Sequence, residues 1–176
     1  METPGRALDL PGTVQAVLER FLTADFTTFA RDGTPITWPV LPTWEPVDGR
    51  FAVMTSIGLP HKAFNARRDP RVSLFYSDST GSDLRDPPTV LVQGDATVSA
   101  EIIVSASQLA PDLAAALERT TVALLRRQPN VGLYVSNPLS RALMGWYFLR
   151  LLIVVHPRRI AWGWDYREGW EVRDVA

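Results

Sequence analysis

The residues from Thr55 to Lys62 could together bind a phosphate group. Two hydroxyl side chains, Thr55 and Ser56, end an expected strand, and a glycine-containing turn leads from them to His61 and Lys62 at the start of an expected helix. A helix N-terminus favours anions because it presents unpaired N–H groups and a positive dipole, and hydroxyl and ammonium donors complete a pocket for a phosphate monoester. The alternative is a loop and an ordinary helix whose basic residues face water. These residues alone leave both interpretations open.

A second group of interest is the strand segment Trp38-Pro39-Val40. Because proline has no N–H, a strand that carries one at its centre lies at a sheet edge or borders a cleft. A flat ring could lie against such a strand and meet neighbouring backbone groups with its polar edge. The alternative is an edge strand whose tryptophan packs in the core. Gly94, inside the expected strand at 90–98, indicates a bulge or a barrel bend.

The composition of the 176 residues excludes several other chemistries. The chain has no cysteine, which excludes disulfides, zinc–thiolate sites and thiol catalysis. With two histidines we expect no metal site, and no Gly-x-Ser-x-Gly turn supports a serine hydrolase. A net charge of −1 argues against a nucleic acid partner, which would require a basic surplus. Among the 18 basic residues, Lys62 is the only lysine.

Turn residues and hydrophobic periodicity indicate a mainly β chain with peripheral helices. Asp-Gly pairs at 32–33 and 48–49 are typical of tight turns between antiparallel strands. Helices are expected at 11–22, 59–69 and 111–127, with a further helix start at Ser136-Asn137-Pro138. Strands are expected at 25–30, 35–40, 51–56, 72–76, 90–98, 149–155 and 158–164, the last two joined by a turn at His156-Pro157. These elements favour a closed or half-open β-barrel, because closure removes sheet edges.

The length fits a single domain, given about 150 residues per domain. We expect this domain to span 1–176, with a core at about 13–165 and a polar C-terminal tail at 165–176 that is frayed or packed on a partner. The N-terminus lacks a signal-peptide pattern. The longest apolar stretch, at 142–155, is interrupted by Arg150 and is shorter than the ~20 residues of a membrane helix. The sequence therefore predicts a cytoplasmic protein without a membrane partner.

The order of these segments resembles the FMN-binding split-barrel superfamily. Its members include the pyridoxamine 5′-phosphate oxidases and the flavin/deazaflavin oxidoreductases common in actinobacteria. The similarity covers about residues 13–165 and rests on the segments DFTTFA, RDGTP, ITWPV, FAVMTS, HKAFNARRDPRVSLFYSD and VLVQGDATV. Its most specific piece is Lys62 with Pro70-Arg71-Val72 after it and Thr55-Ser56 before it. The resemblance implies a six-stranded antiparallel Greek-key split β-barrel that forms a homodimer with two cofactor sites at the dimer interface.

The resemblance also implies roles for single residues. His61 and Lys62 match the basic phosphate-binding pair, although the oxidases usually have Arg where His61 stands, and Thr55 and Ser56 match the strand end near the phosphate. Trp38, Pro39 and Val40 match the strand along which the isoalloxazine ring of FMN lies. Thr89 matches a position that contributes a polar contact in the oxidases. No catalytic side chain can be named.

Two departures separate the chain from the oxidases. They have Arg at the position of Trp38, and they carry a C-terminal motif with Arg and His for pyridoxal phosphate, which the ending AWGWDYREGWEVRDVA lacks. We therefore expect an FMN-dependent oxidoreductase that transfers hydride to or from a small organic substrate, and not a pyridoxamine 5′-phosphate oxidase. One alternative is a reductase that uses the deazaflavin coenzyme F420, whose anionic tail would contact Arg67, Arg68 and Arg71. Another is a non-catalytic split barrel that binds or stores a flavin or haem.

Overall fold

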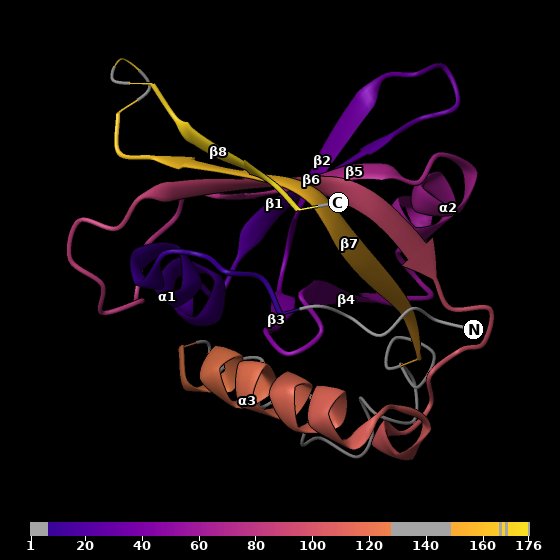
Figure 1. The fold of residues 1–176 in the computed structure, drawn as a ribbon. Coiled ribbons are helices and arrows are strands. Elements are labelled where there is room, and N and C mark those ends of the chain that lie inside the picture. The colour runs from indigo at the N-terminus through magenta and orange to yellow at the C-terminus, as the bar shows by residue number, and fades with distance from the viewer. Residues whose placement is uncertain (1–6, 128–148, 166, 168, 176) are drawn as a thin grey trace.

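The structure is a computed structural model of one chain, and it describes residues 7–127, 149–165, 167 and 169–175. Within these residues, three α-helices and one 3₁₀ helix accompany eight strands (Figure 1). The helices are α1 (Gly12–Arg20), α2 (His61–Arg68), α3 (Pro111–Arg127) and the 3₁₀ helix η1 (Ala106–Gln108). The strands are β1 (Ala24–Phe29), β2 (Pro35–Val40), β3 (Pro42–Glu45), β4 (Arg50–Ser56), β5 (Arg71–Tyr76), β6 (Thr89–Val98), β7 (Arg150–Gly163) and β8 (Glu171–Asp174). The described residues include no helix long and apolar enough to cross a membrane.

All strands belong to one antiparallel sheet in the order β2-β1-β5-β6-β7-β4-β3, and β8 pairs with β7 beside this path. The two ends of the path, β2 and β3, are separated in the sequence by Leu41 alone. The sheet must therefore curl until its two ends meet. If β2 and β3 are counted as one bent strand, the barrel has six strands, and the other five are β1, β4, β5, β6 and β7. This confirms the predicted fold class, a mainly β split barrel with peripheral helices.

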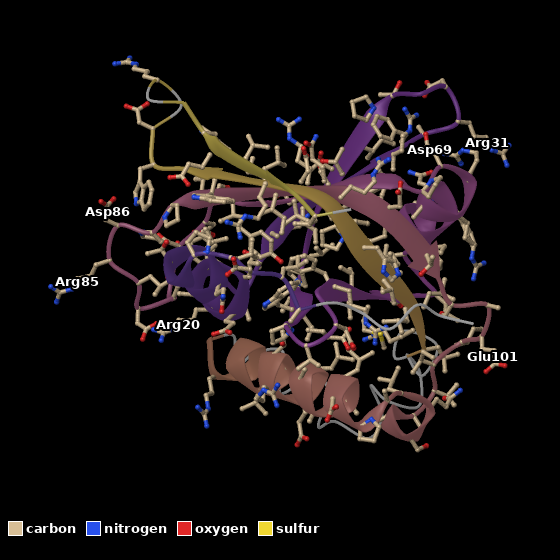
Figure 2. The ribbon with its side chains drawn as sticks, viewed as in Figure 1. Arg20, Arg31, Asp69, Arg85, Asp86 and Glu101 are labelled. Carbon is tan, nitrogen blue, oxygen red and sulfur yellow. The ribbon has the colours of Figure 1, made fainter. Side chains whose placement is uncertain are left out.

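The core fills the inside of the curled sheet. One row of paired residues crosses four neighbouring strands, and each of its members is fully buried: Phe26, Leu74, Val92 and Ile160. Directly paired residues share one face of a sheet, so this row marks the inner face. Burying side chains of this size contributes about 1.5–3 kcal/mol each. Charged side chains such as Arg85, Asp86 and Glu101 point away from the barrel (Figure 2).

The helices cover the barrel at different places. The helix α1 buries Val14, Val17 and Leu18, whose spacing puts them on one helical face. It packs near β3, as does α3, whereas α2 lies beside β1 and β6 (Figure 1). The predicted helices at 11–22, 59–69 and 111–127 are all present with small changes at their ends. The helix start expected at 136–138 lies outside the described residues.

One predicted turn is wrong. The segment at 149–164 is a single long strand, β7, and His156-Pro157 lies inside it. Its pairing with β6 shifts between Gln93 and Gly94, where β7 carries one extra residue. A Cβ atom on Gly94 would lie 2.1 Å from the carbonyl oxygen of His156. The glycine therefore permits a bulge, and the bulge accommodates the proline that the sequence suggested was a strand break.

Two further segments differ from the sequence prediction. The strand β3 was not predicted, although all four of its residues are buried. The tail is also more ordered than expected, because Glu171–Asp174 forms β8 on the side of β7. Trp170 precedes β8 and stacks on Phe75 with 6.3 Å between ring centroids, and it covers Gly163, whose Cβ would lie 2.8 Å from the indole. Residues 170–174 of the tail thus pack on the barrel of their own chain.

Candidate functional site

The two hydroxyls and the lysine that the sequence singled out do come together. Thr55 and Ser56 are the last residues of β4 and are 3% and 8% exposed. The Nζ atom of Lys62 donates a 3.0 Å hydrogen bond to Thr55 Oγ1, which itself donates to the carbonyl of Leu59 at 3.0 Å. Ser56 Oγ accepts a hydrogen bond from the backbone N–H of Gly58 at 3.2 Å. These bonds fold the loop between β4 and α2 back onto the strand end.

Lys62 is a half-buried cation that has no anionic partner among the described residues. None of the ion pairs among the described residues includes it. Burial lowers the pKa of its ammonium group, because less water surrounds the charge. An ammonium has three N–H donors, and the bond to Thr55 occupies one of them. Lys62 therefore offers further donors at the end of β4 and a positive charge that no described acidic residue pairs with.

The N-terminus of α2 adds backbone donors at the same place. Pro60 precedes the helix, no side chain caps it, and its first turn contains no acidic residue. The first N–H groups of a helix have no acceptor within the helix, so the start of α2 is suited to a negative charge. His61 is exposed at the first helical position. We refer to Thr55, Ser56, His61 and Lys62 as the Thr55–Lys62 cluster.

The proline-containing strand lies next to this cluster. The Nζ atom of Lys62 is 5.8 Å from the centroid of the Trp38 ring, a distance typical of a cation–π contact. The strand β2 is at one end of the sheet path and pairs with β1, with Trp38 opposite Phe26. Pro39 is exposed, whereas Val40 is a buried core residue. The structure therefore brings Trp38 to the cluster and presents Pro39 at a sheet edge.

Thr89 is not near the cluster within one chain. It begins β6, pairs with Gly163 and donates a 2.9 Å hydrogen bond to the carbonyl of that residue. Ser56 pairs with Arg150, at the opposite end of the same strand β7. Of the predicted site residues, Thr89 alone is thus separated from the others by the length of β7.

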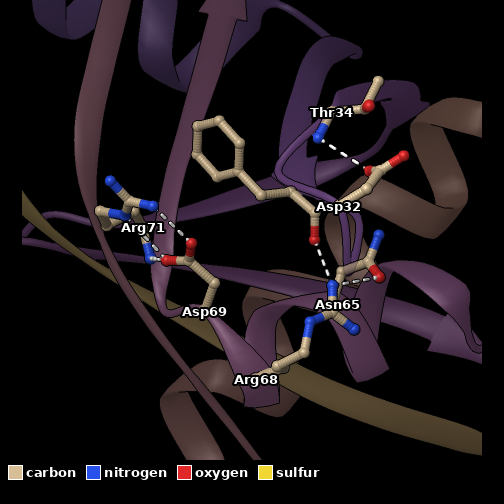
Figure 3. Close-up of polar contacts among 7 residues, drawn as sticks. Asp32, Thr34, Asn65, Arg68, Asp69 and Arg71 are labelled. Carbon is tan, nitrogen blue, oxygen red and sulfur yellow. Dashed lines mark hydrogen bonds and ion pairs between the residues drawn. The ribbon is translucent and has the colours of Figure 1, made fainter.

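A polar network that the sequence did not predict holds α2 against the barrel (Figure 3). The Nδ2 atom of Asn65 donates to Thr28 Oγ1 at 3.1 Å. An Nη2 group of Arg68 donates both to Asn65 Oδ1 at 3.1 Å and to the backbone carbonyl of Phe29. We call these four residues the Asn65 bridge. The sequence contains a partial signal for it, since the small residues Ala63 and Ala66 mark the face of α2 that packs on the barrel, and Asn65 lies on that face.

The end of α2 is also tied to the barrel. Arg71 donates two side-chain hydrogen bonds to Asp69, at 2.9 and 2.6 Å, and its guanidinium lies 5.0 Å from the ring centroid of Phe29. These hydrogen bonds are the largest cause of the low pKa of Asp69, about 2. Arg67 donates to the carbonyl of Ser99. Arg67, Arg68 and Arg71 therefore all have partners within the protein.

The similarity of this chain to known proteins lies in its fold. No protein-family model and no curated protein matches the sequence. A Clostridium acetobutylicum protein related to general stress protein 26, of the pyridoxinephosphate oxidase family, has 10% identity and a TM-score of 0.57 over 92% of each chain. An F420 reductase has 19% identity and a TM-score of 0.52 over 86% of this chain and 98% of its own.

A heme binding protein from Mycobacterium smegmatis has 18% identity and a TM-score of 0.55 over 95% of this chain and 60% of its own. The chain has the split-barrel fold. This is the fold of the superfamily that the sequence resembles, and it agrees with the closure of the sheet through β2 and β3. Two of these split-barrel neighbours, the F420 reductase and the heme binding protein, are named for different cofactors.

Proposed function

We propose that this split barrel binds FMN between α2 and β2 and acts as a flavin-dependent oxidoreductase. The observation that carries the proposal is the half-buried ammonium of Lys62, which lies between a buried hydroxyl and the Trp38 ring and forms no ion pair with any described residue. A cation held partly out of water and without a counter-ion costs free energy. An anionic ligand would offset that cost, and a phosphate monoester is the anion that suits ammonium, hydroxyl and helix N–H donors together.

The residues present fit both ends of FMN. The Thr55–Lys62 cluster would hold the phosphate, with Lys62 and the first N–H groups of α2 as donors. The edge strand β2 would support the ring, because Trp38 and Pro39 leave part of their surface open beside the cluster. Bound FMN would supply the hydride chemistry. The chain itself would bind the phosphate, orient the ring and exclude water from one side of it.

A second copy of the chain is part of this proposal. Thr89 and the Thr55–Lys62 cluster lie at opposite ends of β7 within one chain. A homodimer, as in the superfamily that the sequence resembles, would allow Thr89 of one copy to reach the cofactor held by the other. The site would then be complete only in the dimer.

The arginine contacts support FMN over coenzyme F420. The longer anionic tail of F420 would need cationic groups beyond the phosphate. Arg71 is engaged by Asp69, and Arg67 and Arg68 donate to backbone carbonyls. Because these guanidinium groups already bind protein atoms, they are less suited to an anionic tail. The charge of Lys62 alone suits a single phosphate.

The experiment that tests the proposal is a visible spectrum of the purified protein, followed by mass spectrometry of what denaturation releases. Protein stripped of any ligand is then titrated with FMN and with F420, and the melting temperature is recorded for each. We expect a yellow protein, or FMN binding that raises the melting temperature by mass action. A colourless protein that neither cofactor stabilises would refute the proposal. Bound FMN that neither NAD(P)H nor reduced deazaflavin can reduce would favour a storage role.

A further inference from the structure

The helix α2 is held to the barrel by little apolar contact. Its buried residues are Ala63, Asn65 and Ala66, and two of these offer only a methyl group. Its larger apolar side chain, Phe64, is half exposed. Small residues let a helix approach a sheet closely, but they bury little area, and hydrophobic stabilisation scales with area. Polar contacts must therefore determine where α2 sits.

Asn65 is at the centre of those contacts. It is 9% exposed, and both ends of its amide are bonded, the Nδ2 to Thr28 on β1 and the Oδ1 to Arg68 on its own helix. Thr28 is fully buried, and Arg68 continues the network to the carbonyl of Phe29. A buried amide with satisfied partners fixes one relative position, because any displacement leaves a buried donor or acceptor unpaired. The bridge therefore sets the position of α2 on β1.

This position also sets the distance between the two halves of the proposed cofactor site. Lys62 and Asn65 are three residues apart and lie on one side of α2. Thr28 pairs with Ile36 of β2, two residues from Trp38 in the same strand. The hydrogen bond between Asn65 and Thr28 therefore connects α2, which carries Lys62, to the β1–β2 pair, which carries Trp38. It helps to fix the 5.8 Å distance between the Lys62 Nζ atom and the Trp38 ring.

We propose that Asn65 is a positioning residue that lets the site distinguish phosphorylated from unphosphorylated flavin. This inference rests on the proposed function, since the bridge matters for affinity only if α2 binds the phosphate while β2 supports the ring. Both contacts can form at once when the two elements are held at a fixed separation, and rigid placement reduces the entropy lost on binding. A flavin without phosphate uses β2 alone and gains nothing from the bridge.

The test compares FMN and riboflavin binding, measured by flavin fluorescence quenching, in the full-length protein and three variants. Asn65→Ala removes the bridge, Thr28→Val removes the accepting hydroxyl while keeping the shape, and Thr28→Ser keeps the hydroxyl while losing a buried methyl group. We expect the preference for FMN over riboflavin to fall at least fivefold in Asn65→Ala and Thr28→Val. We expect it to stay within twofold of wild type in Thr28→Ser, with riboflavin affinity within twofold in all variants.

Hydrogen exchange of the α2 amides in the flavin-free protein provides a second readout. Protection should fall in Asn65→Ala and Thr28→Val and persist in Thr28→Ser. An unchanged FMN preference in Asn65→Ala and Thr28→Val overturns the inference while leaving the proposed function intact. Equal loss of preference in all three variants also overturns it, because the effect would then follow lost stability. A wild-type protein that binds neither flavin refutes the proposed function and the discrimination, whereas the exchange result still decides whether Asn65 holds α2.

Discussion

Replacing Lys62 by methionine should weaken FMN binding and leave the free protein at least as stable. The methionine side chain is one atom shorter than that of lysine, remains unbranched and carries no charge. A hydrogen bond to a charged group is worth about 1.5–3 kcal/mol. Because Lys62 is half-buried and solvent weakens its interaction, we take the lower part of that range, about 1.5–2 kcal/mol. That loss corresponds to an increase of about 10- to 30-fold in the dissociation constant for FMN.

The free energy of unfolding of the protein without FMN should rise slightly or stay the same in Lys62→Met. Burial disfavours the charged form of Lys62, so its removal relieves a desolvation cost. The Oγ1 of Thr55 keeps its bond to Leu59 in the variant. The matched control is Arg67→Met, which removes one positive charge from the exposed side of the same helix and should change the FMN dissociation constant by less than threefold. Titration by fluorescence quenching measures the affinities. If Lys62→Met binds FMN within twofold of wild type, the phosphate does not lie at Lys62 and the reasoning fails.

Three other outcomes follow from the structure. FMN affinity should fall as the pH rises through the pKa of Lys62, which burial puts below its ordinary value, and this dependence should be absent in Lys62→Met; a parallel decline in both proteins would contradict it. Gly94→Ala should lower the unfolding free energy by about 2–3 kcal/mol in urea denaturation, because the added Cβ meets the backbone of β7, while Gly12→Ala, where a Cβ meets nothing within 4 Å, should be nearly neutral. Size-exclusion chromatography with light scattering should give twice the mass of one chain, and a monomer that binds FMN with full affinity would show that Thr89 of a second copy is not needed.

The sequence predicted the parts of the site that are close together along the chain. Thr55, Ser56 and Lys62 are joined by a short turn, so their types and spacing were enough to infer that they meet. The contact of Lys62 with Trp38 could be suspected only through the resemblance, because it depends on how the β1–β2 pair is placed beside α2. Asn65 was missed for the same reason, since its partner Thr28 is distant in the sequence.

The errors in the fold have physical causes of a similar kind. Pro157 indicated a turn, but the missing N–H is tolerated at the bulge that Gly94 permits, and the glycine and the proline are far apart in the sequence. The strand β3 is four residues long and starts with a proline, so no alternation was visible before the barrel buried all of it. In the proposed dimer, Thr89 would reach the cluster of a second copy, and patterns within one sequence do not indicate how two copies meet.

The pairing of β7 has a consequence for the end of the chain. One edge of β7 pairs with β6 from Ile153 to Gly163, whereas the other edge is divided between β4 over its first half and β8 over part of its second half. Without the final residues, the second half of that edge would expose unpaired backbone groups, and such an edge invites strand addition from other molecules. By pairing with this edge, β8 reduces the tendency of the protein to aggregate. We expect a chain shortened to residue 169 to associate through the exposed edge and to keep the Thr55–Lys62 cluster intact.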